Sequence, residues 1–249
     1  MQNQLSALVR KAHTLTVFGR PYHPYFLASD MATCAMIIFI AVQDRIAITF
    51  PTTLAAILVA IASHRIYLRF KARITGSASR SLLQDTVLVV LPSYVMAHLL
   101  LGNSVSDALD VAAFFFPLYF GIVRIGCFLG GCCYGVPNAR FGFIYPPVVF
   151  DRKECGCRKF SSGERTDAPV IPIQLIESAF HLSVFAYLYF VATPERGKFL
   201  PLYFILYGSF RFIIDFWRRS SARPRRGPFS EAQLVALVIG ILSAFSMAV

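Results

Sequence analysis

Long apolar stretches dominate this sequence of 249 residues. Most of them approach the roughly 20 residues that an α-helix needs to cross a bilayer. Seven can be drawn: Phe26–Gln43, Ile46–Ala62, Leu83–Leu101, Ala108–Leu129, Ile171–Ala192, Phe199–Trp217 and Ala232–Val249. The chain is 56% hydrophobic and 15% charged, which excludes a soluble domain, a disordered chain and a disulfide-rich miniprotein. We therefore expect an all-α fold, a polytopic membrane helix bundle with about seven transmembrane helices.

The remaining segments fit a single integral-membrane domain over residues 1–249. Residues 1–25 form a polar, mildly amphipathic segment that lacks the continuous apolar core of a cleavable signal. The long basic loop at 134–170 predicts a small folded cap outside the bilayer, between the fourth and fifth spans.

The formal net charge is +11. In membrane proteins, lysine and arginine gather in loops near lipid phosphates, so this charge does not indicate a nucleic-acid partner. Most of the 24 basic residues lie on the side of the N-terminus and of loops 63–82, 134–170 and 218–231, with Arg45, Arg196 and Lys198 opposite. The positive-inside rule predicts that the basic side is cytoplasmic.

The fourth apolar stretch ends in a glycine-rich segment that contains an arginine, Arg124. An arginine one turn inside a membrane helix is costly unless it faces a polar cavity and binds an anion. Gly126, Gly130, Gly131 and Gly135 follow, and such small residues let a backbone or a ligand approach closely. The alternative is a glycine-packed helix end from which the arginine reaches the interface.

Two further stretches carry ionisable residues. In the sixth, Arg211, Asp215 and Arg218 are spaced so that they share one helix face. In the fifth, His181 follows Glu177 by about one helical turn. A glutamate inside a membrane span indicates a functional site. The alternatives are a structural ion pair near the interface and a glutamate that only pairs with buried arginines.

Arginines on two separate spans suggest a ligand. Guanidinium groups bind phosphate bidentately, and the abundant phosphate in a membrane is a phospholipid headgroup. We therefore expect Arg124 and Arg211 to meet around one lipid phosphate, where they can also stabilise it as a leaving group.

The order of these motifs resembles the bacterial prolipoprotein diacylglyceryl transferase family. The family signature Arg-x-Gly-Asn-Phe-x-x-Gly-x-x-x-Gly fits residues 124–135, with Cys127 in place of the asparagine. The family's Pro-x-Gln-Leu-Tyr-Glu fits 172–177, with Ile176 in place of the tyrosine. Its Tyr-Gly-x-x-Arg-x-x-x-Glu-x-x-Arg fits 207–218, with Asp215 in place of the glutamate. Ser230, Gln233 and Asp110 also match, so the resemblance covers about residues 107–245.

The resemblance implies a transferase in the bacterial plasma (inner) membrane that uses no cofactor. It would move a diacylglyceryl group from phosphatidylglycerol, or another anionic phospholipid, to a cysteine thiol of a prolipoprotein, and release glycerol phosphate. Arg124, Arg211 and Glu177 would be catalytic. The implied substrate-binding residues are Gly126, Cys127, Gly131, Gly135, Gln174, Tyr207, Asp215, Arg218 and Asp110.

Two features depart from the family. Its His-Gly-Gly motif is absent from residues 74–85, so a related transferase with another acceptor and a non-enzymatic lipid-binding or transport protein remain alternatives. The family orientation also places the catalytic side in the periplasm, which contradicts the charge count.

Five cysteines lie in the signature at residues 124–135 or in the predicted cap at 134–170. Cys132, Cys133, Cys155 and Cys157 could supply four thiolates to zinc, but their spacing fits no standard zinc motif, so we expect no metal site. Disulfides, packed thiols and a thiol that carries substrate covalently remain open.

Overall fold

The computed structural model describes residues 2–43, 48–75, 86–149, 168–193, 195–218 and 225–248. Within them, six helices are long and apolar enough to cross a membrane. They are α2 (Pro24–Val42), α3 (Phe50–Thr75), α6 (Val105–Leu129), α7 (Ile173–Phe190), α8 (Phe199–Ile214) and α9 (Glu231–Ala248). A 3₁₀ turn, η4 (Asp215–Trp217), extends α8. The shorter α5 (Leu91–Leu100) follows a π-helical turn, η1 (Thr86–Val90). The prediction of a helical membrane bundle is confirmed, and the chain is a multi-pass membrane protein.

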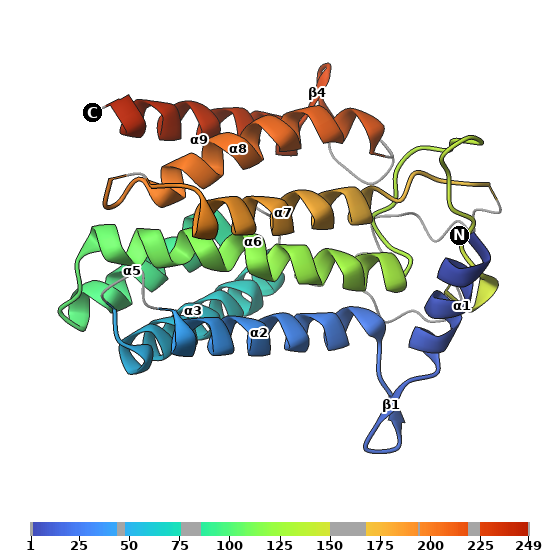
Figure 1. Cartoon of the computed structure of the whole chain (residues 1–249), viewed down its shortest axis with the longest axis horizontal. Coiled ribbons are helices and arrows are strands. Elements are labelled where there is room, and N and C mark those ends of the chain that lie inside the picture. The colour runs from blue at the N-terminus through green and yellow to red at the C-terminus, as the bar shows by residue number, and fades with distance from the viewer. Residues whose placement is uncertain are drawn as a thin grey trace.

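The bundle is built around α6. Helices α2 and α7 lie side by side with α6, and α8 and α9 pack together beyond α7 (Figure 1). Helix α3 packs against α5. We call the end where α2 and α7 begin and α6 and α8 finish the head end. It brings together the segments that the sequence motifs singled out.

Glycines allow the closest helix contacts. A Cβ atom added to Gly126 of α6 would lie 2.4 Å from the Cβ of Ala28 in α2. A Cβ atom added to Gly208 of α8 would lie 2.8 Å from the carbonyl oxygen of Ala236 in α9. Van der Waals contact between helix backbones is a main source of stability inside a bilayer, so these glycines hold the bundle together.

The head end is covered by smaller elements. These are α1 (Gln2–His13), a hairpin of β1 (Thr16–Val17) and β2 (Arg20–Pro21), the 3₁₀ turn η2 (Pro147–Val149), and a hairpin of β3 (Arg225–Arg226) and β4 (Phe229–Ser230). The described parts of the predicted cap share a small core with α1, made of Val9, Phe128, Tyr134, Phe143, Tyr145, Val149 and Val170. Val9 and Leu5 of α1 therefore pack on protein, whereas Leu8 is exposed. Residues 150–167 of the predicted cap lie outside the described residues.

One helix extends well beyond its predicted stretch. The second stretch was expected to end at Ala62, but α3 continues to Thr75. Residues 63–75 mix basic and apolar side chains, which lowers the hydropathy without disfavouring a helix. The third stretch was expected over Leu83–Leu101, and its described part is helical from Thr86 to Leu100, through η1 and α5. The helix ends before Gly102, whose φ is +80°, and residues 83–85 lie outside the described residues.

Candidate active site

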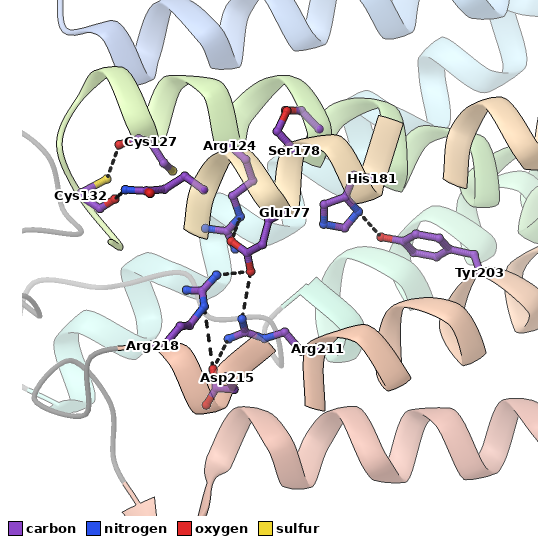
Figure 2. Close-up of polar contacts among 12 residues, drawn as sticks. Arg124, Cys127, Cys132, Glu177, Ser178, His181, Tyr203, Arg211, Asp215 and Arg218 are labelled. Atoms are coloured by element: carbon purple, nitrogen blue, oxygen red, sulfur yellow. Dashed lines mark hydrogen bonds and ion pairs between the residues drawn. The ribbon is translucent and has the colours of Figure 1, made fainter. Parts of the chain in front are cut away.

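One carboxylate gathers three arginines at the head end (Figure 2). Glu177 lies in the second turn of α7, and its side chain has no solvent exposure. Its Oε2 lies 3.0 Å from Nε of Arg124 in α6, and its Oε1 lies 3.0 Å from Nη1 of Arg211 in α8. The Nη2 of Arg218, which follows η4, contacts the same Oε1. Guanidinium groups from separate segments therefore meet at a single point.

A second carboxylate supports the other side of this cluster. Asp215 Oδ1 lies 3.1 Å from Nη2 of Arg211 and 3.9 Å from Nε of Arg218. Asp215 Oδ2 accepts a hydrogen bond from the hydroxyl of Ser230 at the start of α9. We call Arg124, Glu177, Arg211, Asp215 and Arg218 the arginine centre.

The start of α9 is itself fixed by reciprocal capping. The side-chain oxygen of Gln233 accepts from the backbone N–H of Ser230 at 2.9 Å, and the Ser230 hydroxyl accepts from the N–H of Gln233 at 3.1 Å. This is the capping-box pattern, with glutamine at the third helical position. It orients the hydroxyl that holds Asp215.

The arginine centre carries one positive charge in excess, because three guanidinium groups face two carboxylates. Arg211 and Arg218 are buried, whereas the Arg124 side chain is 20% exposed and forms the open edge. Within the described part of the chain, Nε of Arg124 and both Nε and Nη2 of Arg218 make ion pairs but no well-aligned hydrogen bond. A buried excess of cationic donors favours an anion at this point.

Backbone hydrogen bonds from Gly135 and Val136 hold the segment that leads into Arg218. The backbone N–H of Gly135 donates to Ile171 O, and the N–H of Val136 donates to Trp217 O, both at 2.9 Å. A Cβ atom on Gly135 would lie 2.7 Å from Trp217 O, so only glycine fits between the start of α7 and the end of η4. The glycine at this position of the signature thus has a structural reason.

Other predicted residues surround the centre without joining its ion pairs. Gln174 is buried, and its Nε2 donates to Cys132 O and to the hydroxyl of Tyr145, which lies 3.1 Å away. Gly131 adopts φ +64°, and a Cβ atom there would overlap Val149. The Tyr207 ring lies on the membrane-interior side of the centre and contacts a buried histidine, His181.

The cysteines of the signature pack against one another. Cys127 and Cys132 are buried in one cluster, and Cys133 packs against it. The Cys132 thiol donates to the carbonyl of Cys127 at 3.6 Å. Among the described residues, no three His, Cys, Asp or Glu side chains are grouped as a metal site requires. Cys155 and Cys157, which the four-thiolate alternative needs, lie outside the described residues.

Asp110 is not brought to the arginine centre. It lies near the start of α6, fourteen residues before Arg124, which corresponds to about 21 Å along the helix. Its carboxylate accepts from the backbone N–H groups of Gly197, at 2.7 Å, and Phe199, at 3.2 Å. Asp110 therefore fixes the α7–α8 connection, and its role in substrate binding stays a prediction.

Three polar residues near the centre were not assigned a role from the sequence. The Ser178 hydroxyl donates to Gly121 O at 2.7 Å and ties α7 to α6. His181 Nδ1 lies 3.4 Å from the hydroxyl of Tyr203. Ser178 and His181 follow Glu177 on the buried side of α7. Helical spacing already placed His181 one turn from Glu177 and could also have indicated Ser178. Tyr145 lies in an irregular loop, and no local pattern indicates its contact with Gln174.

The family model for prolipoprotein diacylglyceryl transferase matches residues 85–249. The chain is 31% identical over 122 residues to phosphatidylglycerol–prolipoprotein diacylglyceryl transferase 2 of Clostridium perfringens, a match that covers 48% of this chain and 42% of that protein. It is 34% identical over 116 residues to the phosphatidylglycerol–prolipoprotein diacylglyceryl transferase of Dehalococcoides mccartyi, covering 44% and 39%. These matches span less than half the length of the relatives. Because the family model covers most of the sequence, including every residue of the arginine centre, the chain belongs to the prolipoprotein diacylglyceryl transferase family.

Proposed function

We propose that this protein is a transferase of the bacterial inner membrane that acts on phosphatidylglycerol or another anionic phospholipid. It moves the diacylglyceryl group to a cysteine thiol of a prolipoprotein. The observation that carries the proposal is the arginine centre, in which one buried glutamate gathers three guanidinium groups from different segments. Its excess positive charge suits the phosphate of the donor lipid.

The proposed reaction breaks one bond and forms one bond. The acceptor sulfur, as a thiolate, bonds to the terminal glycerol carbon of the diacylglyceryl group. The bond between that carbon and the phosphate oxygen breaks, and its electron pair leaves with glycerol phosphate. The phosphate gains negative charge as it departs, so preorganised guanidinium groups stabilise the transition state more than the bound lipid.

Each arginine has a distinct position in this scheme. Arg124 lies at the partly exposed edge, where the phosphate would enter. Arg211 and Arg218 lie behind it, held by both Glu177 and Asp215. Glu177 and Asp215 are then positioning residues, because they hold the guanidinium planes before the lipid binds.

The test uses the purified full chain in lipid nanodiscs with headgroup-labelled phosphatidylglycerol and a lipobox peptide. We expect release of labelled glycerol phosphate together with a peptide whose mass has increased by one diacylglyceryl group. The Arg211→Ala variant is the control. Release no faster than that of the control would contradict the proposal, and release without peptide modification would identify another acceptor.

A further inference from the structure

The β1–β2 hairpin is a small projection at the head end. It precedes α2 and extends sideways, away from the helix bundle (Figure 1). Thr16 pairs with Pro21 and Val17 with Arg20, so Phe18 and Gly19 form the turn, with φ values of 51° and 72°. The Phe18 side chain is 101% exposed, and Leu15 and Val17 beside it are also exposed.

Phenylalanine at this turn is unfavourable in two ways. The left-handed backbone conformation suits glycine or asparagine and strains a bulky residue. A phenylalanine ring left in water also forgoes about 1.5–3 kcal/mol that burial would provide. Neither cost is offset by contacts of Phe18 with the described residues, so transfer of the ring from water into an apolar layer would be favourable.

The neighbouring helix identifies that layer. The outer side of α2 exposes apolar side chains along its whole length, namely Phe26, Met31, Ile38 and Val42. In a membrane helix such a surface faces acyl chains. The hairpin lies beside the first turn of α2 at the head end (Figure 1). We infer that the lipid headgroups lie at this level, because the lipid-facing surface of α2 ends there.

We propose that the β1–β2 hairpin is an interfacial anchor that binds the phospholipids surrounding the protein, with Phe18 inserted at the boundary between headgroups and acyl chains. Aromatic rings favour this layer, and the exposed Arg20 beside Phe18 can reach lipid phosphates. The hairpin lies outside residues 85–249, which match the family model.

The anchor is rigidly connected to the arginine centre. The Tyr22 hydroxyl donates to the Asp30 carboxylate, and the Tyr22 N–H donates to Leu15 O at 3.0 Å, which fixes the hairpin to α2. Helix α2 then contacts Gly126, two residues beyond Arg124. Insertion of Phe18 therefore sets the depth of the arginine centre relative to the lipid phosphates.

Fluorescence quenching tests the anchor without any assay of transfer. The chain has a single tryptophan, Trp217, so Phe18→Trp in a Trp217→Phe background places one reporter at the hairpin tip. Nanodiscs are prepared with lipids brominated either near the headgroup end or near the methyl end of the acyl chain. We expect about a twofold loss of emission with the first lipid and a smaller loss with the second, as for an interfacial side chain.

A second reporter shows that the assay works. Phe245→Trp in the same background lies on the exposed side of α9, within the membrane, and must be quenched by brominated lipid. The anchor is refuted if the Phe18→Trp reporter is quenched by acrylamide in the aqueous phase and not by brominated lipid, while the Phe245→Trp reporter is quenched by the lipid. Loss of transfer activity with an unchanged quenching pattern would instead count against the proposed function alone.

Discussion

The charge of Glu177 should be required for the stability of the head end. In Glu177→Gln the side chain keeps its shape, but three guanidinium groups lose their shared counter-ion and face one remaining carboxylate. Removing one partner of a buried ion pair costs about 3–5 kcal/mol, because the other charge stays buried without compensation. We expect the free energy of unfolding to fall by an amount in this range.

Thermal unfolding in detergent micelles, followed by circular dichroism, measures the effect. A loss of this size corresponds to a decrease in Tm on the order of 10 °C for a chain of this length. Inorganic phosphate should restore more stability to Glu177→Gln than to the unaltered protein, because an anion can replace the lost charge. This anion effect distinguishes a charge defect from a packing defect.

The exposed Glu195 provides the matched control. Glu195→Gln makes the same chemical change outside the arginine centre and should alter the free energy of unfolding by less than about 0.5 kcal/mol. If Glu177→Gln unfolds at the same temperature as Glu195→Gln, Glu177 does not hold the arginines together, and the proposed positioning role is wrong.

Three further outcomes follow from the same contacts. Arg124→Lys keeps the charge but loses the planar fork, so kcat/KM for diacylglyceryl transfer should fall about 100-fold, and unchanged kinetics would contradict a phosphate contact. Gly126→Ala should lower the free energy of unfolding by about 1–3 kcal/mol, since its Cβ would overlap α2, whereas Gly240→Ala meets no atom within 4 Å and should be neutral or stabilising. Cys133 is partly exposed and Cys132 is buried, so peptide mass spectrometry should find maleimide on Cys133 before Cys132, and the reverse order would refute this packing.

Local patterns were sufficient to predict most of the helices. The length of an apolar stretch decides whether a helix can cross a bilayer, and this property belongs to one segment of sequence. The same locality made the Arg211–Asp215 pair predictable, since residues four apart on a helix are neighbours. The prediction that Arg218 shares their helix face was wrong, because α8 ends at Ile214 and Arg218 follows η4 in extended backbone. The α3 boundary was wrong because hydropathy reports the membrane environment, whereas the helix itself extends beyond the apolar stretch.

The sequence by itself determined a multi-pass helical bundle, the family, and the residues from which a phosphate site could be made. Only the tertiary structure decided that Arg124, Arg211 and Arg218 share the carboxylate of Glu177, that Gln174 instead ties Cys132 to Tyr145, and that Asp110 fixes the opposite end. The physical reason is distance along the chain: helical spacing relates residues within one or two turns. Contacts between residues on different helices depend on which glycine-lined surfaces approach and how the helices rotate as they pack.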